Sequence, residues 1–447
     1  MFYRFVRSVV SFALRLFYRV KVNAGRADFD GPVMYVGNHP NGLIDPALIF
    51  VISRRHVTFL AKAPLFKMPG IGQILKGLGA LPVYRKQDDP TLMAKNEGTL
   101  EAAAGALVQG RAITLFPEGK SHSEPALAEV KTGAARIALR AARQGAKVQV
   151  VPVGLTYAEK NRFRSEVLID VGQPIDAAAL LPAPGQDEAE AVRKLTAVIA
   201  DGLRRITLNL EQWEDLPLIQ FAEALYALRT GEAASDPERM RSFAKGIQLF
   251  RAEQPDRFQR IRAELVTFRD HLHLARVNPQ DLKLIYRPLP VLWFVIRNLA
   301  ALALGLPLFA LGLALFAVPF YVPRLLPAWL KVDLDAQATV KFFATLLIAP
   351  VWIALLTAAG WALFRLPGAL IGLLGSLPLA IFTRYFLEHW RRVFQDVRTF
   401  FAVGTRASLK ARLSSEGERL AAQVEAVAQE LRPRVVDAPA NPAIKTG

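Results

Sequence analysis

Short apolar runs alternate with helical stretches between residues 31 and 175 of this chain of 447 residues. The runs are rich in Val, Ile, Leu and Phe and are bounded by Gly, Pro, Asp or Asn, a pattern typical of buried β-strands. Two stretches that contain several alanines, 91–108 and 132–143, favour helices. The alternation predicts an α/β domain. Its predicted strands are 32–36, 56–60, 81–84, 112–116, 149–153 and 166–171.

The pattern changes after residue 177, where Ala, Leu, Glu and Arg dominate with helical periodicity. This predicts a helical layer as far as residue 284. Beyond residue 290 the chain becomes apolar. The stretches 299–322 and 342–364 carry no charge, and each is long enough to cross about 30 Å of hydrocarbon. A third apolar stretch, 368–382, is shorter and fits a third span, a re-entrant element or an interfacial helix.

Basic residues after the third apolar stretch bear on the topology, because positive flanks favour the cytoplasmic side of a membrane. Two spans return these residues to the side of the α/β domain, whereas three spans place them on the opposite side. We therefore expect an integral membrane protein with two spans and its α/β domain on the cytoplasmic face, with three spans as the alternative. The basic residues are Arg384, Arg391, Arg392, Arg398, Arg406, Lys410 and Arg412.

The first 24 residues predict an amphipathic helix at a membrane interface. Four arginines alternate with phenylalanines and aliphatic residues at spacings near three and four. The apolar run is short, Arg15 interrupts it and no small-residue cleavage site follows, so the segment does not fit a secretory signal. The alternative is a helix that docks on a soluble core.

These patterns divide the chain into five parts. We expect an interfacial helix at 1–24, the α/β domain at 25–210, a helical region at 211–286, a membrane domain at 287–390, and a basic helical tail at 391–447. The last residues, 437–447, alternate Pro and Ala and are expected to be disordered.

The composition favours a membrane partner. Hydrophobic residues make up 52% of the chain, more than a single soluble domain usually has, and the formal net charge is +17. With long apolar stretches present, an anionic lipid surface fits this charge better than nucleic acid, for which no motif is visible. The chain has no cysteine. Disulfides, thiolate metal sites and a cysteine acyl-enzyme are therefore excluded.

The best candidate for proton transfer is the pair His39 and Asp45, in the segment after the first predicted strand. Imidazole titrates near neutrality, so a histidine held by a carboxylate is a good general base. Six positions along a helix would turn the two side chains off one face, so the segment must turn for them to meet. Pro40 and Asn41-Gly42 supply such a turn. The alternative is structural: Asp45 followed by Pro46 also fits a helix N-cap.

Three further blocks follow the ends of predicted strands. Arg85, with Lys86 beside it, offers a bidentate phosphate ligand, although an arginine there is more often a solvated surface residue. Glu118, Gly119 and Lys120 follow another strand; Glu118 could bind a substrate hydroxyl or position the arginine. The fourth block is an apolar strand that contains Pro152 and ends at Gly154. By itself it predicts only a buried strand.

Together the four blocks, NHPNGLID at 38–45, GALPVYR at 79–85, LFPEGKSH at 115–122 and VVPVG at 150–154, resemble the glycerolipid acyltransferase family. The resemblance covers about residues 30–175 and implies a mixed-sheet acyltransferase domain. The family usually has four residues between the histidine and the aspartate, whereas five lie between His39 and Asp45. The wider spacing and the third block look most like the branch of fungal glycerol-3-phosphate and dihydroxyacetone-phosphate acyltransferases.

The resemblance implies the role of each candidate residue. His39 would deprotonate an acceptor hydroxyl while Asp45 fixes its tautomer. Arg85, Glu118, Gly119 and Lys120 would hold the phosphate end of the acceptor. Lys62, Lys86 and Lys131 are further candidates for that anion site, Pro152 for the acyl side, and Asn38 and Pro40 flank the base. For the oxyanion of the intermediate we consider the backbone amides at 37–41.

The expected activity is acyl transfer from a thioester, acyl-CoA or acyl carrier protein, to glycerol 3-phosphate or dihydroxyacetone phosphate in phospholipid synthesis. The alternatives are lysophosphatidate or another lysophospholipid as acceptor, and an inactive lipid-binding membrane protein. No further cofactor and no metal site are expected. His56 and His122 have no evident carboxylate partner in the sequence, and His271 and His273 face different sides of a helix.

Overall fold

The computed structural model describes residues 1–24, 29–85, 89–183, 187–232, 236–283, 288–401 and 407–437. Disorder is expected at 437–447, and of these residues 438–447 lie outside the described set. Two compact units are present. In the described residues, the first unit comprises Met1–Asn209 and Pro327–Phe342, and the second comprises Leu210–Leu326 and the residues from Phe343 onward.

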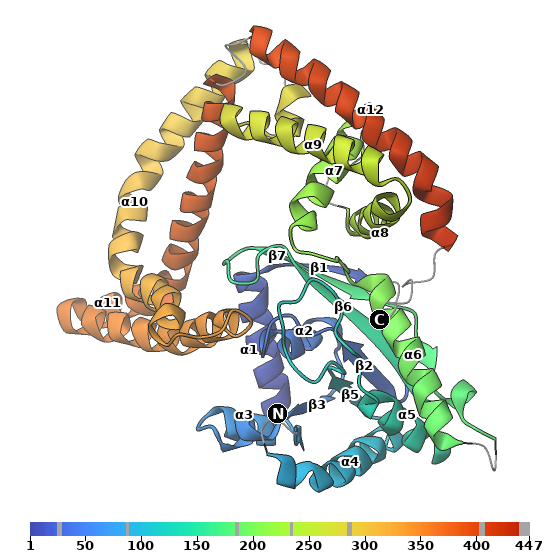
Figure 1. Ribbon diagram of the computed structural model, residues 1–447. Coiled ribbons are helices and arrows are strands. Elements are labelled where there is room, and N and C mark those ends of the chain that lie inside the picture. Colours follow the sequence, from blue (N-terminus) through green and yellow to red (C-terminus); the bar gives the residue numbers. More distant parts are fainter. Residues whose placement is uncertain are drawn as a thin grey trace. The chain divides into compact units, whose positions relative to one another are not determined.

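A mixed sheet of eight strands forms the centre of the first unit (Figure 1). The strand order is β1-β7-β6-β2-β5-β3-β4, and β8 pairs with β6. Neighbouring strands run parallel except where β6 meets β7 and β8. The strands are β1 (Arg19–Ala24), β2 (Val33–Gly37), β3 (Val57–Lys62), β4 (Leu81–Val83), β5 (Ala112–Leu115), β6 (Gln149–Tyr157), β7 (Glu166–Val171) and β8 (Ile175–Asp176).

The central strands of the sheet are buried on both faces because helices cover them. Every residue of β2 and β5 is buried, as expected for parallel strands that read as continuous apolar runs. Met34 and Val36 pack into a core shared with three helices, and strand alternation turns Val33 and Tyr35 to the other face. The helices that share this core are α4 (Asn96–Val108), α5 (Gly133–Arg143) and α6 (Glu188–Ile206).

Three further helices belong to the described part of this unit. α2 (Ile44–Ile52) follows β2, and α1 (Phe2–Phe17) contacts it. α3 (Ile71–Gly77) and the 3-10 turns η1 (Ala63–Lys67), η2 (Pro90–Lys95) and η3 (Ala178–Leu180) complete the connections.

All six predicted strands are present, and two further strands were missed. β1 is the more informative, because the prediction included it in the N-terminal helix. That helix ends at Phe17, and Arg19–Ala24 then pairs in parallel with β7 at the edge of the sheet. The segment reads Arg-Val-Lys-Val-Asn-Ala, an alternation with period two that the basic residues disguise as part of an amphipathic helix.

α1 docks on the first unit through one face, as the alternative to an interfacial helix predicted. Val10, Leu14 and Phe17 are buried, and Ser11 Oγ donates a hydrogen bond to the carbonyl of Phe50 at 3.2 Å. Phe5 and Phe12 lie on the exposed face. Contact of this exposed face with a membrane stays a prediction.

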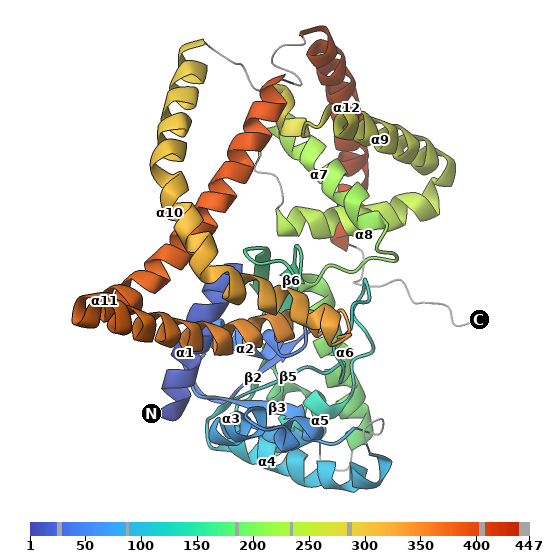
Figure 2. The same cartoon turned by 90° about the vertical axis from the view of Figure 1, so that its left-hand side faces the viewer.

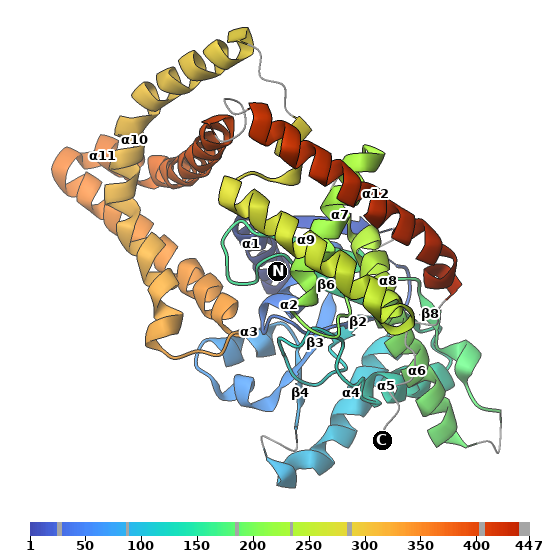
Figure 3. The same cartoon turned by 45° about the horizontal axis from the view of Figure 1, so that its top comes forward.

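A bundle of four helices forms part of the second unit: α7 (Asp215–Thr230), α8 (Pro237–Glu253), α9 (Pro255–Ala275) and α12 (Ala407–Asp437). Figure 3 shows α9 and α12 side by side. Ion pairs Arg419–Glu264 at 2.6 Å and Arg257–Glu430 at 2.7 Å join these two helices. The tail that the sequence placed in a part of its own is therefore the fourth helix of the preceding helical region. The 3-10 turn η4 (Pro279–Lys283) packs against α7 and α12.

Two helices, Leu289–Trp329 within α10 (Pro288–Trp329) and α11 (Gln337–Thr399), are long and apolar enough to cross a membrane. Their most apolar windows are almost entirely exposed, unlike the core helix of a soluble protein. α11 is not continuous, because Arg365 has non-helical angles (φ 56°, ψ −139°). The two arms of α11 meet at Gly360 and Gly368, where a Cβ on either residue would come within 2.2 Å of the other's carbonyl oxygen. The apolar stretch at 368–382 therefore belongs to an arm that folds back along the preceding one (Figure 2).

Replacement of Leu14 by alanine tests the docking of α1. The side chain is fully buried, so we expect Leu14→Ala to lower the free energy of unfolding by about 2–5 kcal/mol. Phe12→Ala on the exposed face is the matched control and should change it by less than about 0.5 kcal/mol. Thermal unfolding of the full chain in detergent measures both. Equal effects of the two variants would contradict the observed orientation of the helix.

Candidate active site

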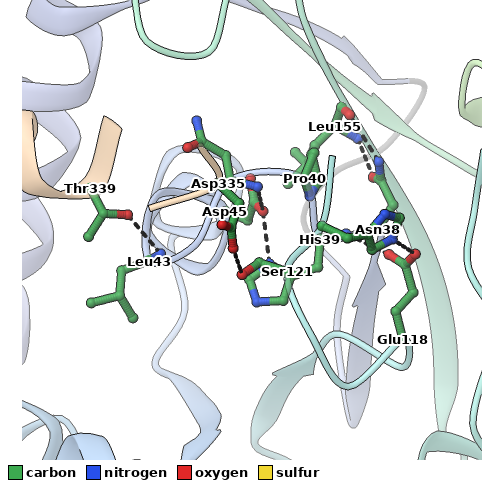
Figure 4. A network of polar contacts seen from close by, with 12 residues as sticks. Asn38, His39, Pro40, Leu43, Asp45, Glu118, Ser121, Leu155, Asp335 and Thr339 are labelled. Atoms are coloured by element: carbon green, nitrogen blue, oxygen red, sulfur yellow. Dashed lines mark hydrogen bonds and ion pairs between the residues drawn. The ribbon is translucent and has the colours of Figure 1, made fainter. Parts of the chain in front are cut away.

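A tight turn between β2 and α2 brings the predicted pair together (Figure 4). His39 Nδ1 lies 2.8 Å from Asp45 Oδ2. The Asp45 carboxylate is fully buried, whereas the imidazole is 18% exposed. Because the carboxylate accepts the Nδ1 proton, Nε2 is the nitrogen that can take a proton from a substrate. The His39 ring also stacks on Phe116, with 4.4 Å between ring centroids.

Three donors hold Asp45. Besides His39, the backbone N–H of Asn41 donates to Oδ2 at 2.6 Å, and the Tyr157 hydroxyl donates to Oδ1 at 2.6 Å. The N-cap alternative is wrong, because α2 begins at Ile44, its N-cap is Leu43 and no side chain caps it. Asp45 instead lies inside the first turn, where the helix dipole also favours a negative charge.

Two tyrosines lie next to the aspartate, the buried Tyr18 and the half-buried Tyr157. Burial, together with the nearby Asp45 charge, raises the pKa of Tyr157 well above its ordinary value. Burial also raises the pKa of Tyr18, whose hydroxyl accepts a hydrogen bond from the Asn41 side chain at 3.2 Å. Both hydroxyls therefore keep their protons at neutral pH. The sequence did not reveal Tyr157 as a site residue, because the strand predicted at 149–153 stops four residues before it.

Asn38 and Pro40 fix the turn from its other side. The Asn38 amide donates to the carbonyl of Leu155 at 3.0 Å and accepts from its N–H at 2.7 Å, which ties the turn to β6. The Pro40 carbonyl accepts from Lys160 Nζ at 2.8 Å, and Lys160 also donates to Ser123. Burial lowers the pKa of Lys160, and the charges of Asp45 and Asp335 oppose that effect. Lys160 lies in a loop without any motif, so no sequence signal pointed to it.

Both oxygens of Glu118 accept hydrogen bonds from the protein itself, and the expected contact with the acceptor stays a prediction. Glu118 is buried, its Oε1 accepts from the His39 backbone N–H at 2.7 Å, and its Oε2 accepts from the Ala128 N–H at 2.8 Å and from His122 Nε2. Burial raises the pKa of this carboxyl, but the hydrogen bonds from His122, Ala128 and His39 outweigh it and hold the pKa below its usual value. His122 thus has the carboxylate partner that the sequence did not reveal.

Only some of the basic residues predicted for the anion site lie near Gly119. Arg85 donates to the Gly119 carbonyl at 3.4 Å, and the Lys131 side chain lies so close that Nζ would be 2.7 Å from a Cβ on Gly119. Lys62 ends β3, where it pairs in register with Val83 of β4, two residues before Arg85. Lys120 is exposed. Lys86 lies outside the described residues.

Pro152 is not part of this cluster. Its ring packs against Gly172 and Gly202, so its place in β6 fits a packing role rather than the acyl side. Among the expected oxyanion donors, the amides of His39 and Asn41 are already committed to Glu118 and Asp45. A cavity of about 550 Å³ lined by Phe29, Gln149 and Gly172, among others, contains none of the candidate residues.

The other histidines have separate environments. His56 stacks on Tyr3 with 4.0 Å between ring centroids, and burial lowers its pKa. His271 lies 3.6 Å from Glu416 in the bundle. Across the described part of the chain, no group of three or more His, Cys, Asp or Glu side chains could hold a metal ion.

The geometry suits proton abstraction by His39 Nε2. The histidine has a buried carboxylate on Nδ1 and an accessible Nε2, and Arg85 and Lys131 lie near Gly119, next to the glutamate that binds the histidine backbone. The chain matches the family model for acyltransferases over residues 19–156. Over these residues the chain is similar to acyltransferase domains.

Curated proteins are also similar to part of the chain. The chain is 36% identical over 134 residues to glycerol-3-phosphate O-acyltransferase 2 of Saccharomyces cerevisiae, covering 29% of this chain and 18% of the relative. It is 29% identical over 153 residues to glycerol-3-phosphate O-acyltransferase 1 of the same yeast, covering 32% and 20%. An uncharacterized acyltransferase of Schizosaccharomyces pombe is 24% identical over 310 residues, covering 49% and 46%. The chain thus spans less than half the length of each of these relatives.

A solved structure is also similar. The 1-acyl-sn-glycerophosphate acyltransferase PlsC from Thermotoga maritima is 23% identical, with a TM-score of 0.33 over 44% of this chain and 78% of that chain.

Glu118→Gln tests the positioning role of this carboxylate. Because the folded-state pKa lies below the usual value of about 4.3, the charge contributes its full stability above that value and loses it as the pH falls through the folded-state pKa. We expect Glu118→Gln to cost about 1.5–3 kcal/mol at pH 7, and the gap to the unchanged protein to close below about pH 4. Thermal unfolding at a series of pH values measures the gap. Glu124→Gln, on an exposed neighbour, is the control, and a gap for Glu118→Gln that did not change with pH would contradict the prediction.

Proposed function

We propose that this protein is a membrane-bound O-acyltransferase that moves a fatty acyl chain from a thioester to a hydroxyl of glycerol 3-phosphate or dihydroxyacetone phosphate, a reaction of phospholipid synthesis. The observation that carries the proposal is the His39–Asp45 pair, at 2.8 Å, inside a domain of the acyltransferase family. The two yeast relatives support glycerol 3-phosphate as acceptor by their names.

The proposed reaction is direct transfer. His39 Nε2 takes the proton from the acceptor hydroxyl as its oxygen forms a bond to the thioester carbonyl carbon. The tetrahedral intermediate then collapses, the carbon–sulfur bond breaks, and the leaving thiolate takes the proton back from the imidazolium. Asp45 accepts the hydrogen bond from Nδ1–H throughout and stabilises the positive charge on the ring. No residue of the chain needs to carry the acyl group.

The phosphate of the acceptor is proposed to bind beside Gly119. Arg85 and Lys131 bring two positive charges to this point, and Lys62 and Lys120 are further candidates at the same end of the sheet. Arginine suits a phosphate because its planar guanidinium binds two oxygens at once. Glu118 contributes indirectly, since it links this block to the backbone of His39.

The acyl donor is proposed to be acyl-CoA or acyl carrier protein, with no other cofactor. The long apolar helices support attachment to a membrane, and the net charge of +17 supports contact with anionic lipids. We place the acyltransferase domain on the cytoplasmic face, the side that the basic residues after 383 favour. Nucleic acid is not proposed as a partner.

Substitution of the base is the first test. His39→Ala should lower kcat by at least about a hundredfold, because general base catalysis contributes roughly 10²–10⁴. Asp45→Asn should have a similar effect, since it alters the histidine tautomer. Transfer of a labelled acyl chain is measured from each donor to glycerol 3-phosphate, dihydroxyacetone phosphate and lysophospholipids. Near-normal rates in His39→Ala would overturn the mechanism, exclusive use of lysophospholipids would change the acceptor, and lipid binding without transfer would identify an inactive lipid-binding protein.

Arg85→Ala tests the anion site. Loss of a charged hydrogen bond costs about 1.5–3 kcal/mol, so we expect the KM for the phosphate-bearing acceptor to rise roughly ten- to a hundredfold with a smaller change in kcat. Arg54→Ala, at an exposed arginine after α2, is the matched control and should leave the KM unchanged. A KM unaffected by Arg85→Ala would move the phosphate site elsewhere.

A further inference from the structure

The end of α10, the loop after it and the start of α11 form a connection, residues 327–342. This connection lies against the turn that carries His39. Although about 290 residues separate them along the chain, Pro327–Phe342 belongs to the same compact unit as the acyltransferase domain. The Leu43 N–H donates to Thr339 Oγ1 at 3.1 Å, and Ser121 Oγ donates to Asp335 Oδ2 (Figure 4). The first contact is to the catalytic turn, and the second is to the block that follows Gly119.

Close packing shows that the contact involves backbone as well as side chains. Gly42 has a positive φ of 46°, and a Cβ at this position would lie 2.8 Å from Thr339 Oγ1 and 3.1 Å from the carbonyl oxygen of Asp335. A side chain at Gly42 would thus meet both backbone strain and the connection. The turn has the one residue type that lets the connection approach so closely.

Further contacts extend to the loop behind the turn. Lys341 Nζ donates to the Asn161 carbonyl at 3.1 Å, and the Asn161 side chain donates to Gln337 at 3.3 Å. Asn161 follows Lys160. The Lys160 ammonium donates a hydrogen bond to the Pro40 carbonyl, and the nearby charge of Asp335 raises its pKa against the effect of burial. The connection therefore supports the turn directly at Leu43 and indirectly through the loop that contains Lys160.

We infer that Asp335 and Thr339 are positioning residues for the His39–Asp45 turn, so that the apolar helices help to set the geometry of the base. This inference rests on the proposed acyl transfer. A base must be held within a fraction of an ångström of its working position, and small displacements cost large factors in rate. The segment Pro327–Phe342 thus supports the proposed active site from outside it.

The same contact decides on which side of a membrane the connection lies. Pro327–Phe342 belongs to the same compact unit as the acyltransferase domain and touches it at Leu43, so the connection and the domain lie on one side.

Kinetics test the positioning role. Thr339→Val removes the acceptor of the Leu43 N–H and should lower kcat by about tenfold, with the KM of the acyl donor unchanged. Thr339→Ser keeps the hydroxyl and should restore kcat, which a merely structural role of the methyl group would not predict. Asp335→Ala should also lower kcat, whereas Asp333→Ala, on an exposed aspartate in the same connection, should not. Unchanged kcat in both Thr339→Val and Asp335→Ala would overturn the inference.

Cysteine labelling tests the placement without any activity, and the chain starts free of cysteine. A membrane-impermeant maleimide is applied to sealed vesicles that carry Asp333→Cys or, as the reference in the acyltransferase domain, Gln144→Cys. We expect both variants to react from the same side. A short thiol crosslinker should also join the double variant Ser121→Cys, Asp335→Cys. Reaction of Asp333→Cys only from the opposite side, or no crosslink, would overturn the placement, whereas failure of acyl transfer alone would overturn only the proposed function.

Discussion

The buried carboxylate of Asp45 is the interaction on which the rest of the site depends. It accepts hydrogen bonds from the His39 ring, the Asn41 backbone and the Tyr157 hydroxyl, which come from the turn itself and from β6. A carboxylate removed from water is stable only when its oxygens are satisfied, and each charged hydrogen bond contributes about 1.5–3 kcal/mol. The fold must therefore close around Asp45, and closing around it orients the imidazole.

Glu118 repeats this principle with a different group. It is also buried with both oxygens occupied, but it binds the backbone of His39 rather than the ring. One carboxylate thus sets the orientation of the ring and the other sets the position of its main chain. Because Glu118 is next to Gly119, whose carbonyl accepts from Arg85, it also joins the base to the anion site. A shift in either block would move both.

The segment Pro327–Phe342 contacts the turn that carries His39, within the same compact unit. Thr339 and Asp335 reach Leu43 and Ser121, and the absence of a side chain at Gly42 makes room for them. Under the proposed acyl transfer, this contact supports the position of the base.

The sequence by itself determined the elements whose local pattern is unambiguous. Six of the eight strands, the long apolar helices and the pair His39 and Asp45 follow from periodicity, length and residue chemistry, and the four blocks carry the resemblance to the acyltransferase family. Tertiary structure decided what local pattern leaves open. The strand at Arg19–Ala24 exists because β7 offers an edge to pair with, and the role of Glu118 follows from which donors surround it. Tyr157, Lys160, Asp335 and Thr339 carry no local signal, because their function arises only when segments up to 296 residues apart meet at one turn.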